Sequence, residues 1–172
     1  MKVFTKWLNR VFIDGLSGMA HGLFATLIVG TIIQQIGTLV GGDIGNTIFL
    51  IGKVAAALTG AGIGVGVASK YKESPLVILS AATAGMVGAF AGKLMAGQVL
   101  VDGVMQFSGP GEPLGAFIGA YIAIEAGHLV SGKTKVDILV TPLVSIGAGS
   151  AVGLLVGPTI SQIMTSLGAL IN

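Results

Sequence analysis

Long apolar stretches separated by short polar segments dominate the hydrophobic pattern of this chain. The stretches cover about residues 15–40, 44–68, 75–101, 114–130 and 136–157. At 1.5 Å per residue, about 20 apolar residues cross the ~30 Å hydrocarbon core of a bilayer. The pattern therefore predicts an all-α integral membrane protein in which residues 15–172 form a bundle of about five transmembrane helices.

The N-terminal residues 1–14 show a different pattern. Apolar side chains, Trp7 among them, recur there at steps of three and four residues, and Lys2, Lys6 and Arg10 fall largely on the other side. This arrangement predicts an amphipathic helix that lies in the membrane interface. In the alternative, these residues extend the first transmembrane helix on the cytoplasmic side.

Basic residues alternate between successive polar segments. Counted along the chain, the segments hold 3, 0, 2, 0 and 2 of them: Lys2, Lys6 and Arg10, then Lys70 and Lys72, then Lys133 and Lys135. Cytoplasmic loops carry an excess of Lys and Arg. The alternation therefore predicts a cytoplasmic N-terminus.

Proline positions help to place the helix ends. Pro75 and Pro113 stand at the start of their stretches, where a missing N–H group costs least, and Pro142 should kink the last stretch. Residues 158–172 keep three interpretations open. They could complete the fifth helix after a kink at Pro158, lie along the outer interface, or form a re-entrant segment.

Composition supports a membrane protein and excludes several other classes. The chain is 53% apolar and 9% charged, against about 25% charged residues in soluble domains, and its mean hydropathy is +0.94. The net charge of +2 comes from basic residues grouped between apolar stretches, which indicates topology signals and no nucleic-acid partner. The chain has no cysteine, GxSxG, HExxH or Walker loop, so we predict no catalytic residue, metal site or cofactor.

Glycine is abundant, with 29 residues, and many of them recur at helix-packing intervals. The GxxxG pairs are Gly18 and Gly22, Gly88 and Gly92, Gly115 and Gly119, and the series Gly149, Gly153 and Gly157. Small residues at this spacing allow membrane helices to approach closely. The pairs therefore predict a tight bundle.

A second glycine pattern occupies alternate positions, at Gly60, Gly62, Gly64 and Gly66. Alternate residues do not share one helical face, and glycine weakens helices. One interpretation is a flexible segment, an unwound or broken helix that lines a cavity. The other is a thin, closely packed helix.

Four ionisable residues inside the apolar stretches are candidates for a substrate or proton path, namely His21, Lys53, Lys93 and Glu125. Counting 1.5 Å per residue puts Glu125 and His21 at ~8–9 Å from the cytoplasmic ends of their helices and the two lysines in an outer layer. We therefore expect His21 to pair with Glu125, and an anionic group to lie between the lysines. A structural hydrogen bond and lysine side chains that extend to the interface are the alternatives.

Three segments resemble a known family. They are GLSGMAHGLFATLIVGTIIQQIGTLVG, GEPLGAFIGAYIAIEAGHLVSGKTKVDILVTPLV and VGPTISQIM, and the block from Ser131 to Leu143 is the most specific part. They resemble EIIC-like bacterial membrane proteins of the sugar phosphotransferase system, some of which are named as regulators of perfringolysin. The resemblance spans the chain and implies the N-terminal half of such a protein.

The resemblance implies a multi-pass protein of the bacterial cytoplasmic membrane that moves a small polar solute such as a sugar. It further implies cytoplasmic phosphotransferase components as partners, together with a second transmembrane half or a second copy of the chain. A membrane ligand sensor or regulator without transport activity is the alternative function. In both cases we expect the chain to have no catalytic activity of its own.

Overall fold

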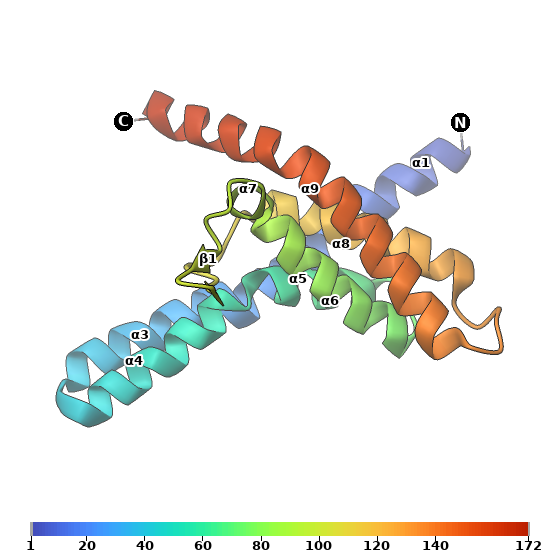
Figure 1. Ribbon diagram of the computed structural model, residues 1–172. Coiled ribbons are helices and arrows are strands. Elements are labelled where there is room, and N and C mark those ends of the chain that lie inside the picture. The colour runs from blue at the N-terminus through green and yellow to red at the C-terminus, as the bar shows by residue number, and fades with distance from the viewer. Residues whose placement is uncertain (1, 172) are drawn as a thin grey trace.

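Helices make up almost the entire fold in the computed structural model, which describes residues 2–171 (Figure 1). In chain order they are α1 (Lys2–Asn9), α2 (Leu16–Leu23), α3 (Val29–Val40), α4 (Gly42–Ala57), α5 (Thr59–Lys70), α6 (Pro75–Ala89), α7 (Ala91–Met95), α8 (Pro113–Val130) and α9 (Asp137–Ile171). Two π-helical segments, η1 (Arg10–Gly15) and η2 (Phe24–Ile28), join α1 to α2 and α2 to α3. The predicted all-α class is therefore confirmed.

Residues 2–40 form one helix that runs from α1 through η1, α2 and η2 to α3 without a break. Residues 2–14 are thus continuous with the helix that follows, and their position in the membrane interface stays a prediction. The helix continues through Gly15 because that glycine is buried and fits against Tyr71 and Phe117, so packing outweighs its weak helix propensity.

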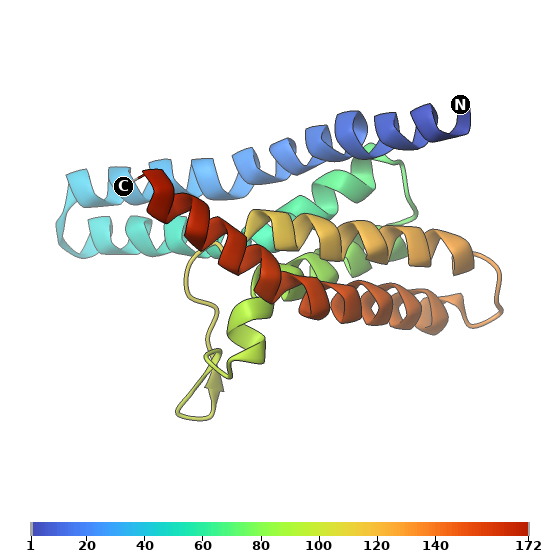
Figure 2. The same ribbon diagram turned by 90° about the horizontal axis from the view of Figure 1, so that it is seen from above.

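A sharp bend separates α4 from α5. The two helices meet at Leu58 at an angle of 52°. Gly41 and Gly42, both with positive φ angles (67° and 62°), form the turn that returns the chain from α3 to α4. As a result α3 and α4 form an arm that extends away from the rest of the bundle (Figures 1 and 2).

The third apolar stretch ends earlier than we predicted. Helix α6 stops at Ala89, α7 ends at Met95, and residues 100–101 belong to a small hairpin instead of a helix. In that hairpin β1 (Leu100–Val101) pairs antiparallel with β2 (Val104–Met105). Asp102 and Gly103 between them have positive φ angles (51° and 77°), as a two-residue Asp-Gly turn requires.

The last 35 residues of the described chain form a single helix, α9, which contains both Pro142 and Pro158. Residues 158–171 therefore complete the fifth helix, the first of the three interpretations. The ribbon changes direction in its C-terminal part (Figure 1), and Pro158 removes one backbone donor there.

Helix α5 lies at the centre of the bundle, between α2 and α6 and against α8. Helices α6, α8 and α9 also pack on one another. The buried core is made mostly of small and β-branched side chains from α5, α6 and α8, together with the rings of Phe90 and Phe117. Its main members are Ile63, Val67, Val77, Ala81, Phe90, Ala116, Ala120 and Ile124.

Glycines bring the backbones of these helices into direct contact. Gly62 and Gly66 of α5 lie against Gly22 and Gly18 of α2. A Cβ on Gly18 would stand 2.6 Å from the Gly66 carbonyl oxygen, a separation that real side chains do not reach. The GxxxG pair of the first stretch therefore packs as predicted.

Three helices in the described chain are long and apolar enough to cross a membrane: Phe4–Val40, Pro113–Val130 and Asp137–Ser166. The bent pair Gly42–Ala57 and Thr59–Lys70 raises the number to four if it forms one span. Helix α6 is apolar but has 15 residues, which rise only about 22 Å. The count of five spans stays a prediction, because α6 and α7 together would have to complete one.

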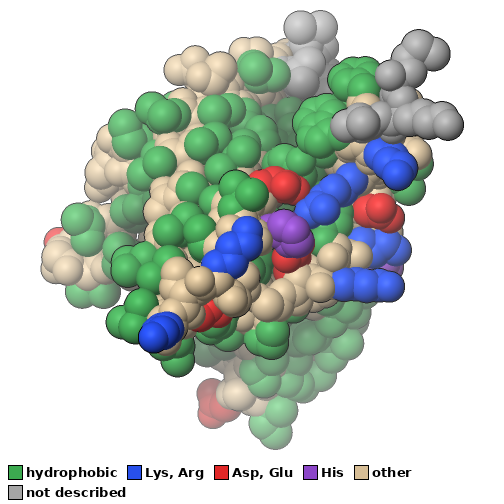
Figure 3. Space-filling model, turned by 90° about the vertical axis from the view of Figure 1, so that its right-hand side faces the viewer, with side chains coloured by type: hydrophobic (Ala, Val, Ile, Leu, Met, Phe, Trp, Pro, Cys, Tyr) green, Lys and Arg blue, Asp and Glu red, His purple; other side chains and the backbone are tan. Residues whose placement is uncertain are grey.

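The basic segments meet at one end of the bundle. The ion pair of Arg10 with Glu73 (3.4 Å) and the hydrogen bond between Ser74 and Ser131 (2.9 Å) bring the N-terminal helix, the α5–α6 turn and the α8–α9 loop together. Lysine and arginine side chains are accordingly concentrated on this face (Figure 3).

The glycine contacts of α5 generate a stability prediction. A methyl group at Gly64 would overlap the backbone of Ala81 in α6, whereas one at Gly147 of α9 would meet nothing within 4 Å. We expect Gly64→Ala to lower the free energy of unfolding by about 1–3 kcal/mol, the usual effect of overpacking. Gly147→Ala should leave it unchanged or raise it by up to ~1 kcal/mol, because alanine favours helix.

Thermal unfolding of both variants in the same detergent measures the difference. A Gly64→Ala protein as stable as Gly147→Ala would contradict the close approach of α5 and α6.

Candidate functional site

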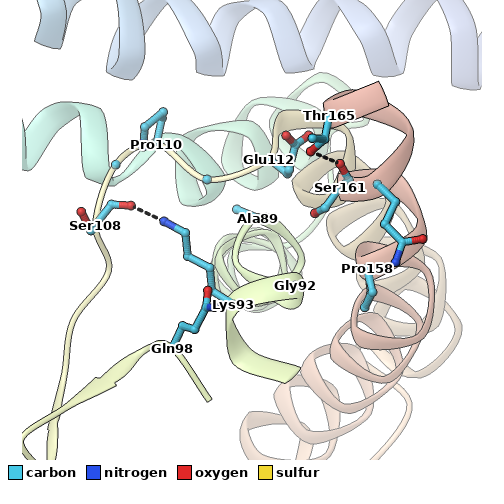
Figure 4. Close-up of a pocket in the computed structure, with 13 residues that line it drawn as sticks. Ala89, Gly92, Lys93, Gln98, Ser108, Pro110, Glu112, Pro158, Ser161 and Thr165 are labelled. Atoms are coloured by element: carbon cyan, nitrogen blue, oxygen red, sulfur yellow. Dashed lines mark hydrogen bonds between the residues drawn. The ribbon is translucent and has the colours of Figure 1, made fainter. Parts of the chain in front are cut away.

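A cavity of about 620 Å³ lies where α7, the start of α8 and the C-terminal part of α9 meet. We refer to it as the Lys93 cavity (Figure 4). Its lining is Ala89, Gly92, Lys93, Gln98, Ser108, Gly109, Pro110, Gly111, Glu112, Pro158, Ser161, Gln162 and Thr165. Side chains that can form hydrogen bonds therefore line it both from α9 and from the segment between α7 and α8.

One wall of the cavity is an extended segment, residues 106–112, which leads from the hairpin to α8. Its end is held by the Glu112 N–H group, which donates to the Ala89 carbonyl oxygen (2.7 Å). Gly111, with φ of 74°, lies so close to Ala89 that a Cβ would stand 2.7 Å from the Ala89 oxygen. Phe107 packs on the core ring Phe90, with 4.8 Å between ring centroids. The segment is thus fixed against the end of α6.

Two opposite charges are part of this cavity. The Lys93 ammonium donates to the Ser108 carbonyl oxygen (2.9 Å), which fixes its position beside the extended segment (Figure 4). Glu112 is half-buried and precedes the first residue of α8, where the helix dipole favours a negative charge. Within residues 2–171, its carboxylate makes no hydrogen bond or ion pair that would occupy it.

Neutral polar groups complete the lining. Gln98 and Gln162 each offer an amide that both donates and accepts, and Ser161 and Thr165 offer hydroxyl groups. The Thr165 hydroxyl donates to the Ser161 carbonyl oxygen (2.8 Å) and can still accept a bond. With one positive and one negative charge, the cavity suits a neutral solute that carries several hydroxyl groups.

Lys53 lies apart from Lys93. It is exposed on α4 and lines a second cavity of about 660 Å³, the Lys53 cavity, which also borders the extended segment. Ser108, Gly109 and Pro110 line both cavities. The two lysines thus border cavities with a common wall. That they share an outer layer of the membrane stays a prediction.

The expected pair of His21 and Glu125 does not form. The Glu125 carboxylate instead lies 3.1 Å from the Arg10 guanidinium, and His21 is exposed on α2. The depth estimate assumed that the first helix begins near residue 15. Because the helix begins at Lys2, the level of Glu125 corresponds to Arg10, about three turns before His21.

Arg10 and Glu125 belong to a polar cluster at the basic end of the bundle. Glu73, whose side chain is 7% exposed, lies 3.4 Å from Arg10 and 3.0 Å from the His128 ring. The Arg10 guanidinium also lies over the Tyr71 ring, 4.4 Å from its centroid. The cluster joins η1, the α5–α6 turn and α8, so it fixes this end of the bundle.

Burial raises the pKa of Tyr71 to about 12, and the nearby phenol of Tyr121 adds to the effect. The Tyr71 hydroxyl donates to the Arg10 carbonyl oxygen (2.8 Å). Tyr71 therefore stays neutral at physiological pH and acts in the cluster as a hydrogen-bond donor.

The four alternate glycines lie within helix α5, and the break at Leu58 comes just before them. Gly60 and Gly64 face α6, whereas Gly62 and Gly66 face α2. Alternate positions on an α-helix point to nearly opposite sides. The four glycines therefore lie in a closely packed helix. The helix is broken at Leu58, before the first of them.

Apart from Lys93, the polar residues of the Lys93 cavity were not among the residues predicted from the sequence. Glu112 and Gln98 lie in segments interpreted as an outer loop or the end of a span, and Ser161, Gln162 and Thr165 lie in the tail whose placement was open. One signal was available for Glu112, because a carboxylate between Gly111 and Pro113 directly precedes a helix start.

In the described part of the chain, no group of three or more His, Cys, Asp or Glu side chains is placed to hold a metal ion. In a comparison with protein families, the family model described as "Phosphotransferase system, EIIC" matches residues 13–172. Comparisons with curated proteins and with solved structures found no match.

The polar cluster generates a second stability prediction. We expect Arg10→Met to lower the free energy of unfolding by about 2 kcal/mol, because Glu73 and Glu125 would lose their common counter-ion. This figure is below that of a fully buried pair because the Arg10 side chain is 36% exposed. Lys6→Met, at an exposed position on the same helix, should have little effect.

Thermal unfolding of the two variants in one detergent separates these expectations. Equal shifts for Arg10→Met and Lys6→Met would mean that the cluster contributes no stability.

Proposed function

The chain belongs to the phosphotransferase system EIIC family, and from this membership and the Lys93 cavity we propose that it is a permease-like membrane unit for a sugar. Membership in that family indicates a membrane component related to sugar transport. The proposal adds the place where the solute binds and the side chains that hold it.

The observation that carries the proposal is the balance of polar groups in the Lys93 cavity. Polar side chains on apolar helices are costly unless they face protein or water, yet Ser161, Gln162 and Thr165 lie together on one segment of α9 and line this cavity. A polyhydroxylated solute would satisfy these groups. A charged solute would give the occupied cavity a net charge, whereas a neutral one leaves the charges of Lys93 and Glu112 balanced.

We assign distinct roles to the two charged residues. The Glu112 carboxylate accepts hydrogen bonds from solute hydroxyl groups, and the Lys93 ammonium, fixed by its bond to Ser108, donates to a solute oxygen. Hydrogen bonds to charged groups are about twice as strong as those between neutral groups. These two residues therefore supply most of the affinity, and the amides supply selectivity.

The proposed orientation places the basic end of the bundle, with the Arg10 cluster, in the cytoplasm of a bacterial cell. Cytoplasmic components of the phosphotransferase system would meet the protein on that face. In this proposal such a partner supplies the phosphoryl group.

A second membrane body, either another transmembrane half or a second copy, fits this proposal. The exposed side chains of Gln162, Thr165 and Ser166 on α9 leave polar surface open beside the cavity. Such surface is unfavourable against lipid. A covering body would close the cavity on that side.

Uptake of a panel of labelled sugars into vesicles tests the proposed function. We expect one sugar to accumulate, and Glu112→Gln to weaken its apparent affinity about tenfold or more, because a hydrogen bond to a charged group contributes about 1.5–3 kcal/mol. Asp102→Asn, which removes an exposed carboxylate at the hairpin tip, should leave uptake unchanged.

Binding of the same sugars to the detergent-purified protein distinguishes the alternative. A sugar that binds with the expected dependence on Glu112 but does not accumulate would favour a ligand sensor. Absence of both binding and uptake for folded protein would contradict the proposal.

A further inference from the structure

The Lys53 cavity differs in chemistry from the Lys93 cavity. It lies between α4 and the extended segment, and α3 contributes Gln34. The α4 side is mainly apolar, with Leu50, Val54 and Ala57, whereas Gln106 and Ser108 on the other side are polar. A ligand in this cavity would contact apolar side chains on the α4 side and hydrogen-bonding groups on the other side.

The cavity carries an uncompensated positive charge. No acidic residue lines it, and within the part of the chain described here Lys53 forms no ion pair. Its ammonium lies 5.8 Å from the centroid of the Phe49 ring, a contact that leaves the charge in place. Lys93, by contrast, donates to Ser108 and shares its cavity with Glu112.

A lysine in an apolar helix is costly and marks a functional position unless its charge is compensated. Helix α4 belongs to the bent apolar pair that qualifies as a membrane span. Lys53 has four residues to the end of α4 at Ala57, followed at once by the bend. An anion in the adjacent cavity would compensate the Lys53 charge and so remove the free-energy cost of a lysine in this apolar helix.

Additional donors point toward the same kind of ligand. In residues 2–171, the backbone N–H groups of Ser108 and Gly109 make no hydrogen bond to another backbone group. Pro110, the next residue, has no N–H group. The Gln106 amide and the Ser108 hydroxyl can donate as well. These donors add to the unpaired ammonium of Lys53.

We propose that the Lys53 cavity is a second binding site, separate from the solute site, for a phosphate group. Lys53 is its counter-ion, Gln106 and the extended segment donate to its oxygens, and the apolar wall of α4 receives whatever hydrocarbon the ligand carries. A phospholipid headgroup and a free phosphate share this chemistry. This proposal does not depend on the proposed sugar function, because Lys53 and Gln106 do not line the Lys93 cavity.

Phosphate binding to the full chain in a phosphate-free detergent tests the site, with added phosphatidylglycerol as one probe and labelled inorganic phosphate as the other. We expect the dissociation constant of the bound probe to be about tenfold higher for Lys53→Met than for the wild type, since a charge-assisted bond is lost. Lys53→Arg should retain binding. Lys70→Met, at an exposed lysine on the basic end, is the matched control.

Gln106→Ala provides a second variant on an exposed loop, where loss of folding is no concern, and should weaken binding by a smaller factor. Retention of phosphatidylglycerol alone identifies a lipid headgroup. Binding of inorganic phosphate that displaces phosphatidylglycerol identifies a free phosphate. Wild type that binds neither probe, or binds no better than Lys53→Met, overturns the proposal and leaves Lys53 extended to the membrane interface.

Discussion

Direct contact between the backbones of α5 and its two neighbours is the constraint on which the remaining structure depends. Glycines on opposite faces of α5 let α2 approach on one side and α6 on the other. No hydrophobic effect drives apolar helices together within a bilayer, so close van der Waals packing must do so. A side chain at any of these positions would push the helices apart and leave gaps that the small core residues could not fill.

This central packing also determines where the cavities form. With α5 held between α2 and α6, the bend at Leu58 directs α4 and its partner α3 away from the bundle. Helix α6 ends at Ala89, and the extended segment crosses the space between that end and α8. The Lys93 and Lys53 cavities have this segment in common.

Much of the fold could be predicted from the sequence because its signals are local. Pro75 and Pro113 stand at the helix starts where the missing N–H group costs nothing, and the glycine spacing of Gly18 and Gly22 identified a packing face. The position of Glu125 beside Arg10, and not beside His21, could not be predicted, since it required the register between two helices. An error in the start of the first helix moved that register by several turns.

The site was hidden for a related reason. Glu112 is separated from Ser161 by some fifty residues, and only the tertiary fold brings them to one cavity. Hydrophobic pattern describes how each helix meets lipid but not which polar residues of different helices share a space.

The central claim is that polar residues of α9 face a water-filled cavity and not lipid. Because the natural chain has no cysteine, Ser161→Cys and Leu155→Cys give two single-thiol proteins on one helix, the second at a side chain that is 79% exposed. We would measure their labelling by a membrane-impermeant thiol reagent in reconstituted vesicles. The account predicts rapid labelling at position 161 and slow labelling at position 155. Equally slow labelling at both positions would contradict it.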